Sequence, residues 1–110
     1  MHPRRGEVWW VSFDPSLGGE IQKTRSAIIL SNNAANVALD RVIVVPITSQ
    51  VSKVYPGEAL VMLNGQQRKA MADQIATTSK QRLKSKLGTL SGTDMTAVEN
   101  VVLLQTGIMR

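Results

Sequence analysis

Three side chains have the chemistry needed to bind a phosphate group: Arg25, and the neighbouring Thr48 and Ser49 further along the sequence. Arg25 stands where a loop enters a strand-forming stretch, and its planar guanidinium offers a fork of donors that matches phosphate oxygens. Thr48 and Ser49 end a second strand-forming stretch, and strand ends beside loops are common positions for functional groups. The pattern alone leaves two interpretations open: a phosphate site, or a surface arginine and a turn hydroxyl.

Several other kinds of catalytic site are excluded by the residue inventory. His2 is the only histidine and the chain has no cysteine, so a zinc cluster, a Ser-His-Asp triad or a two-histidine nuclease cannot be built from one chain. Gly18-Gly19 satisfies neither a P-loop nor a dinucleotide-binding motif. An enzyme with this sequence would therefore act mainly by positioning and electrostatic stabilisation.

Strand-forming residues surround these candidate groups. Residues 7–13 are predicted to form a first strand and residues 25–31 a second, joined by an Asp-Pro and Gly-Gly loop. Residues 34–39 are compatible with a helix. The strongest strand pattern is the β-branched run 41–48, in which Pro46 predicts either an edge position or a bulge.

The following residues predict more strands. Residues 58–63 form a strand that turns at Asn64-Gly65, a favoured hairpin pair, and residues 68–78 are predicted to return as its partner. Residues 80–83 indicate one helical turn, and residues 86–90 a short last strand. Short strands without regular βαβ alternation predict a mainly β protein, a small closed or half-closed barrel.

The chain ends in one clear helix. Ser91 is the predicted N-cap, and Asp94 three residues later resembles a capping box with a shorter acid. An apolar stripe widened by Val98 and Val102 predicts that the helix packs against the barrel and closes it. The stripe consists of Ala97, Val101, Leu104 and Ile108.

Length and charge constrain the class of protein. The 110 residues suit a single domain, 1–110, and no apolar run approaches the roughly 20 residues of a membrane span. The absence of cysteine fits a reducing compartment, so we expect a cytoplasmic protein. The net charge is +5, and residues 51–90 carry seven basic and two acidic residues. That zone suits a phosphate polymer or an acidic protein, and equally a solvated surface.

Five blocks of sequence occur in the order and spacing of one known family. These are residues 5–11 (RGEVWWV), the loop 14–20, residues 24–33 (TRSAIILSNN), residues 44–49 (VVPITS), and residues 73–75 (DQI) with 80–83 (KQRL). One block alone would be weak evidence, but together they resemble the MazF/PemK family of toxins over nearly the whole chain. The resemblance implies an SH3-like, CcdB/PemK-type barrel with a C-terminal helix.

The same resemblance implies an activity and partners. A member of this family is expected to be a homodimeric endoribonuclease toxin that cleaves single-stranded RNA at a short sequence without a metal or other cofactor. The acidic, disordered tail of a MazE-like antitoxin is expected to block the RNA groove. The reaction implied is attack by the RNA 2′-hydroxyl on the adjacent phosphorus, which leaves a 2′,3′-cyclic phosphate and a 5′-hydroxyl.

The resemblance also assigns roles to the candidate residues. Arg25 would contact the phosphoryl oxygens, and the Thr48 hydroxyl would hold the same phosphate. An arginine side chain stays protonated at neutral pH, so Arg25 is expected to stabilise charge rather than act as a base. Asp73 is then only a candidate base. Ser26 replaces the family's usual proline, and Met71 replaces an arginine of some members, which argues against a mechanism that needs that second arginine.

RNA sequence would be recognised at the edges of unstacked bases. The polar residues expected to do this are Gln22, Lys23, Asn32, Ser49 and Gln74. The loop 15–23 is expected to fold over bound RNA. Trp9 and Trp10 alternate along a strand, so one should face the core, and stacking of a base on the other is a lesser alternative.

Two rival functions remain open. A CcdB-like toxin on the same barrel would bind a protein such as gyrase without cutting RNA, and fold alone does not decide between the two. A non-catalytic nucleic-acid-binding barrel is disfavoured, because two Trp, one Tyr and one Phe make a sparse stacking platform.

Overall fold

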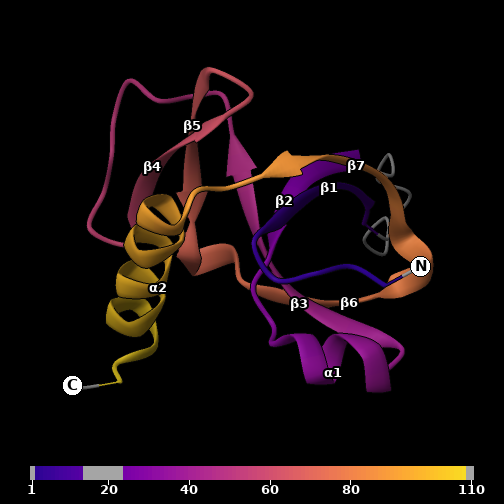
Figure 1. Cartoon of the computed structure of the whole chain (residues 1–110). Helices are drawn as coiled ribbons and strands as arrows, with labels where there is room; N and C mark the ends of the chain where they lie inside the picture. Colours follow the sequence, from indigo (N-terminus) through magenta and orange to yellow (C-terminus); the bar gives the residue numbers. More distant parts are fainter. Residues whose placement is uncertain (1, 14–23, 109–110) are drawn as a thin grey trace, which may run out of the picture.

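Seven antiparallel strands form a single curled sheet in the computed structural model, which describes residues 2–13 and 24–108 (Figure 1). The neighbours along the sheet are β4, β5, β3, β2, β1 and β7, and β6 pairs with β3. The strands are β1 (Glu7–Ser12), β2 (Thr24–Ile29), β3 (Arg41–Thr48), β4 (Glu58–Leu63), β5 (Gln66–Met71), β6 (Ala76–Ser79) and β7 (Leu83–Thr89).

Two α-helices complete the described part of the chain. Helix α1 (Asn33–Ala38) connects β2 to β3, and α2 (Gly92–Thr106) follows β7. Figure 1 shows α2 beside β4 and β5, on the opposite side of the molecule from the curled strands β1 and β7. The predicted mainly β half-barrel with a C-terminal helix is confirmed. Within the described residues no helix is long and apolar enough to cross a membrane.

The predicted edge or bulge at Pro46 was wrong, because β3 lies inside the sheet. On one side β3 pairs with β2, where Pro46 faces Ala27. On the other side its partner changes: pairing with β6 ends at Val44, and pairing with β5 begins at Ile47. The Leu30 amide donates to the Ile43 carbonyl, so by strand alternation the nitrogen of Pro46 faces the interrupted side. Proline is tolerated there because no ladder bond is lost.

The prediction of one return strand over residues 68–78 was also wrong. The hairpin turn at Asn64-Gly65 is confirmed, with φ of 51° and 79°, and β5 pairs with β4 as expected. The chain then makes a 3-10 turn at Ala72–Gln74 and continues as β6, which pairs with β3 instead. This turn moves the chain from one half of the sheet to the other. A second 3-10 turn, Lys80–Arg82, confirms the predicted helical turn and leads into a last strand longer than predicted.

Two apolar clusters hold the curled sheet together. One lies between α2 and strands β1 to β5, and the other is enclosed by β1, β2 and β3. Neighbouring residues such as Val44 and Val45 therefore point into different clusters, and both are fully buried. The continuous β-branched run of β3 is explained by this burial on both faces.

Helix α2 packs through a face that matches the predicted stripe only in part, at Val98 and Val102. Met95 and Val98 are buried and Val102 packs against the first cluster. By contrast, Leu104 is 62% exposed and Ile108 is 55% exposed. The spacing of three and four residues was identified correctly, but several apolar residues on adjacent faces made the orientation ambiguous.

The N-terminus of α2 confirms half of the predicted capping box. The Ser91 hydroxyl accepts a hydrogen bond from the Asp94 amide at 3.1 Å. The Asp94 carboxylate does not return this bond to the cap, but accepts from the Met62 amide of β4 at 2.8 Å. Asp94 therefore ties α2 to a backbone donor on the end strand of the sheet.

Candidate functional site

Arg25 and Thr48 line one cavity, although they are 23 residues apart in the sequence. Arg25 lies at the beginning of β2 and Thr48 at the end of β3. Because the two strands are antiparallel neighbours, these ends meet at the same edge of the sheet. The cavity has a volume of about 280 Å³ and is also lined by Trp10, Ser49 and Arg68.

Arg25 presents its charge to this cavity. Its Nη1 donates to Oε1 of Gln74 at 3.1 Å, and Gln74 lies in the 3-10 turn after β5. Gln74 is neutral, and no ion pair joins Arg25 to a carboxylate of the described residues. The guanidinium therefore has donors and a net positive charge available for an anion.

The Thr48 hydroxyl is oriented by its own backbone. Its Oγ1 accepts a hydrogen bond from the amide of Gln50 at 3.2 Å. Since a hydroxyl has one proton and two lone pairs, accepting this bond leaves the O–H free to donate to a ligand oxygen. Thr48 and Arg25 together supply a neutral and a charged donor, which is suited to a phosphate.

The two tryptophans have different environments. Trp9 is 5% exposed, and its Nε1 donates to Oε1 of Glu7 at 3.0 Å. Trp10 is 39% exposed and lines the cavity. The prediction that one of them faces the core is confirmed, and Trp10 is the one placed to contact a ligand.

Glu7, which begins β1, is held in its charged form. Burial alone would raise its pKa, but hydrogen bonds from the Arg4 amide, the Trp9 indole and the Lys86 ammonium outweigh burial and lower the pKa below its ordinary value. Lys86 lies 3.0 Å from the carboxylate. These contacts fix Trp9, and with it the orientation of Trp10 on the other face of β1.

The remaining predicted site residues separate into three groups. Ser49 lines the cavity and Gln74 contacts Arg25. Asp73 lines a different cavity, with Tyr55 and Glu58. Asn32 caps α1, accepting from the Ala35 amide at 2.8 Å, at the opposite end of β2 from Arg25. The structure therefore places neither Asp73 nor Asn32 among the cavity residues. Gln22, Lys23 and the loop 15–23 lie outside the described residues.

Arg68 is a charged residue of the cavity that sequence reasoning did not select. It belongs to β5, whose Lys69 pairs with Thr48, so Arg68 lies beside the chain just beyond the end of β3. Its membership of the basic zone 51–90 was the only signal in the sequence. Locating it required the β3–β5 pairing, which the strand pattern did not predict.

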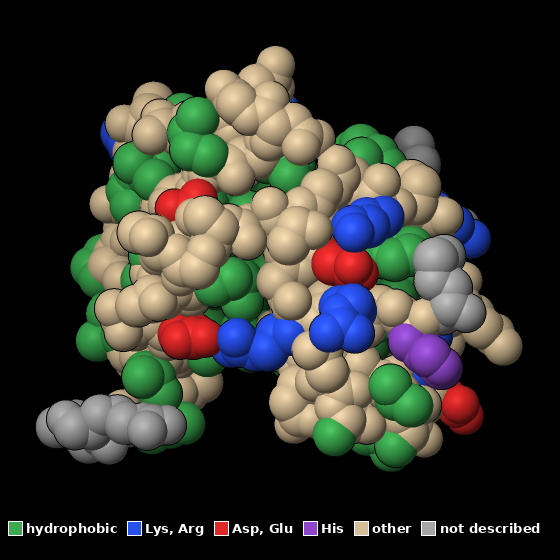
Figure 2. Space-filling view, viewed as in Figure 1, with side chains coloured by type: hydrophobic (Ala, Val, Ile, Leu, Met, Phe, Trp, Pro, Cys, Tyr) green, Lys and Arg blue, Asp and Glu red, His purple; other side chains and the backbone are tan. Residues whose placement is uncertain are grey.

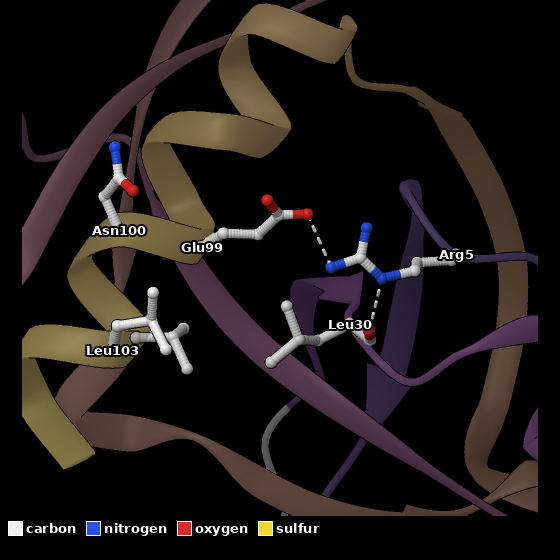
Figure 3. Close-up of a pocket in the computed structure, with 6 residues that line it drawn as sticks. Arg5, Leu30, Glu99, Asn100 and Leu103 are labelled. Carbon is white, nitrogen blue, oxygen red and sulfur yellow. Dashed lines mark hydrogen bonds and ion pairs between the residues drawn. The ribbon is translucent and has the colours of Figure 1, made fainter. Parts of the chain in front are cut away.

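A larger cavity of about 520 Å³ lies between α2 and the sheet, and its chemistry is different (Figure 3). Arg5 lies between Glu99 of α2, 2.7 Å away, and the Leu30 carbonyl, to which its Nε donates at 2.9 Å. Leu103 and Leu30 supply apolar walls. Because Glu99 neutralises Arg5, this cavity offers less to a phosphate than the smaller one.

On one face of the molecule the positive charges of basic side chains are likewise neutralised by nearby carboxylates. Figure 2 shows that the Lys and Arg side chains across the middle of this face lie next to Asp and Glu side chains. Two ion pairs between basic and acidic side chains of the described residues are Arg5–Glu99 and Lys86–Glu7. The positive net charge therefore does not by itself identify a binding site on this face. Arg25 and Arg68, by contrast, form no ion pair with a carboxylate of the described residues. No group of three or more potential metal-ligating side chains occurs among the described residues.

Comparison with known proteins identifies the family of the chain. Residues 4–105 match the family model of the PemK-like, MazF-like toxins of type II toxin–antitoxin systems, and the chain belongs to this family. Endoribonuclease MazF9 of Mycobacterium tuberculosis is 36% identical, over 92% of this chain and 93% of the relative. Endoribonuclease toxin MazF of Escherichia coli K12 is also 36% identical, over 88% and 87%.

A solved structure has the same fold. The crystal structure of MazE-MazF from Deinococcus radiodurans superposes with a TM-score of 0.80 at 25% identity, covering 99% of this chain and all of that chain. The resemblance read from the sequence blocks is thus confirmed in both family and fold.

Proposed function

We propose that the chain is an endoribonuclease toxin that cleaves single-stranded RNA at a short sequence and is inhibited by a cognate, MazE-like antitoxin. The observation that carries this proposal is the convergence of Arg25 and Thr48 on one cavity. Membership of the MazF-like family and the endoribonuclease relatives favour RNA cleavage over the rival gyrase-binding function. The MazE-MazF structure supports an antitoxin as partner.

Arg25 and Thr48 act together on the scissile phosphate. As the 2′-hydroxyl oxygen bonds to phosphorus, negative charge grows on the non-bridging oxygens, and the Arg25 guanidinium stabilises that charge. The Thr48 hydroxyl donates to the same phosphate and holds it in line for attack. The bond to the 5′-oxygen then breaks, the proton of the 2′-hydroxyl passes to solvent water, and solvent water protonates the leaving 5′-oxygen, which gives a 2′,3′-cyclic phosphate and a 5′-hydroxyl. Ser49 and Gln74, beside these groups, read base edges.

The step needs no metal or other cofactor, because the charge is stabilised by side chains. Asp73 lines another cavity and has no part in the transfer of the proton from the 2′-hydroxyl in this scheme. The protein works in the cytoplasm, as one domain of residues 1–110 that pairs as a homodimer. The exposed apolar side chains of Leu104 and of Leu60 and Met62 in β4 favour such pairing.

Cleavage in the presence of a chelator tests this function. We expect the purified protein to cut single-stranded RNA with undiminished rate in excess EDTA, since Arg25 and Thr48 provide the stabilisation. The new 5′ ends should accept a phosphate from polynucleotide kinase without prior phosphatase treatment, as 5′-hydroxyl ends do. Intact RNA together with inhibited gyrase would contradict the proposal and favour the rival toxin.

A further inference from the structure

Arg68 is the second guanidinium of the candidate cavity, and its own contacts leave its charge uncompensated. Its Nη1 donates to the Gln67 carbonyl at 3.0 Å, and its Nη2 donates to Oε1 of Gln66 at 2.7 Å. Both acceptors are neutral and belong to the same strand. These bonds hold the side chain in place, and no ion pair joins it to a carboxylate of residues 2–13 or 24–108.

Three other basic side chains of the described structure are neutralised by a carboxylate. Arg5 pairs with Glu99, Lys69 with Glu58 and Lys86 with Glu7, at 2.7, 3.1 and 3.0 Å. Arg25 and Arg68 both contact neutral acceptors, and both line the same cavity. Two like charges that share a cavity repel each other, so the arrangement favours an anionic ligand with more than one negative group.

The sheet places the two arginines on opposite sides of Thr48. Strands β2 and β5 both pair with β3, and they carry Arg25 and Arg68. Strands in a sheet lie about 4.8 Å apart, so β2 and β5 are separated by roughly 10 Å. The cavity of about 280 Å³ is smaller than the roughly 300–1,000 Å³ of pockets that enclose whole small ligands. It therefore suits a segment of a longer polyanion.

We propose that Arg68 is a substrate-binding residue that contacts a phosphate next to the scissile one in single-stranded RNA. Arg25 and Thr48 contact the scissile phosphate, and Arg68 holds the strand in register across the end of β3. This inference rests on the proposed function. It predicts that Arg68 contributes to RNA affinity and its salt dependence, and little to the chemical step.

Binding of an uncleavable strand tests this role directly. The probe is a mixed-sequence, fluorescently labelled 2′-O-methyl oligoribonucleotide, which lacks the attacking hydroxyl, and anisotropy is measured over a series of salt concentrations. For Arg68→Ala we expect roughly tenfold weaker binding at low salt, as for loss of one charged hydrogen-bonding partner. The slope of log affinity against log salt should fall by about 0.7, the value for one single-strand phosphate contact.

Two variants serve as controls. Arg41→Ala removes the same side chain from an exposed position at the other end of β3, and should leave affinity and slope unchanged. Arg68→Lys keeps the charge and should keep the slope, which separates charge from side-chain volume. Circular dichroism confirms that each variant is folded. In cleavage assays Arg68→Ala should raise KM roughly tenfold and change kcat by less than about twofold.

The outcomes separate this inference from the proposed function. If the wild-type protein cleaves RNA but Arg68→Ala binds the probe with wild-type affinity and slope, the inference is wrong and the function stands. If the wild-type protein binds the probe through Arg68 but does not cleave RNA, the function is wrong and the phosphate site stands. A wild-type protein that does not bind the probe at all contradicts the inference.

Discussion

Replacing Arg25 with alanine should lower the rate of RNA cleavage by about 1,000-fold or more, while the protein remains folded. The guanidinium is the charged donor at the proposed scissile phosphate, and its charge is not neutralised by a carboxylate of the described residues. Its one described partner, Gln74, is neutral, so folding stability should change by less than about 1 kcal/mol. The rate is measured under single-turnover conditions in EDTA.

The matched control for this variant is Arg41→Ala. Arg41 is an exposed arginine at the beginning of β3, whereas the cavity lies at the end of that strand. Cleavage by Arg41→Ala should stay within about twofold of wild type, because surface charges away from a site have small effects. An Arg25→Ala protein that is folded and still cleaves within tenfold of the wild-type rate would remove Arg25 from the mechanism.

Replacing Thr48 with valine should slow cleavage by about 100-fold, the usual loss for one neutral donor at developing negative charge. Valine keeps the β-branched shape that suits the end of β3 and removes only the hydroxyl. In the structure this hydroxyl accepts from the Gln50 amide, which leaves its proton for the phosphate. The measurement is again the single-turnover rate, accompanied by a thermal melt.

Thr48→Ser tests whether the site needs the hydroxyl group or the methyl group of the threonine. Serine keeps both the bond from Gln50 and the free proton, so most of the activity should return. Equal rates for the valine variant and the wild-type protein would show that the hydroxyl does not act on the phosphate.

The sequence was sufficient to predict the strands that carry this site. The β-branched run of β3 was predicted at its observed bounds, Arg41–Thr48, and the Asn64-Gly65 hairpin followed from its turn residues. Local patterns of this kind predict the secondary structure of each segment. The family resemblance then supplied what local patterns cannot, which is the pairing of Arg25 with Thr48.

Errors occurred where distant contacts decide the structure. Pro46 suggested an edge strand, yet β3 is internal, with partners on both sides. Proline is tolerated there because the partner on one side changes from β6 to β5 at that residue. The same change of partner brings Arg68 to the cavity, and for this reason sequence reasoning missed it. Asp73 follows β5 closely in sequence, but the 3-10 turn at Ala72–Gln74 directs Gln74 to Arg25 and places Asp73 in another cavity.

The orientation of α2 shows a related limit. Its apolar residues cover more than one face, so helical spacing selected Val98 and Val102 but missed Met95, and it included Leu104 and Ile108, which are exposed. Packing against β4 selected this face, since Asp94 of the helix accepts a bond from Met62. The exposed Leu104 was then left on a face that no described residue covers.

A double-mutant cycle tests most directly whether Arg25 and Thr48 act on the same phosphate. Single-turnover rates are measured for wild type, Arg25→Ala, Thr48→Val and the protein with both changes. Two groups that stabilise one developing charge are coupled, so the double variant should be slower by clearly less than the product of the two single losses. Losses that multiply fully would mean that the two groups act independently, which contradicts a shared phosphate at the end of β3.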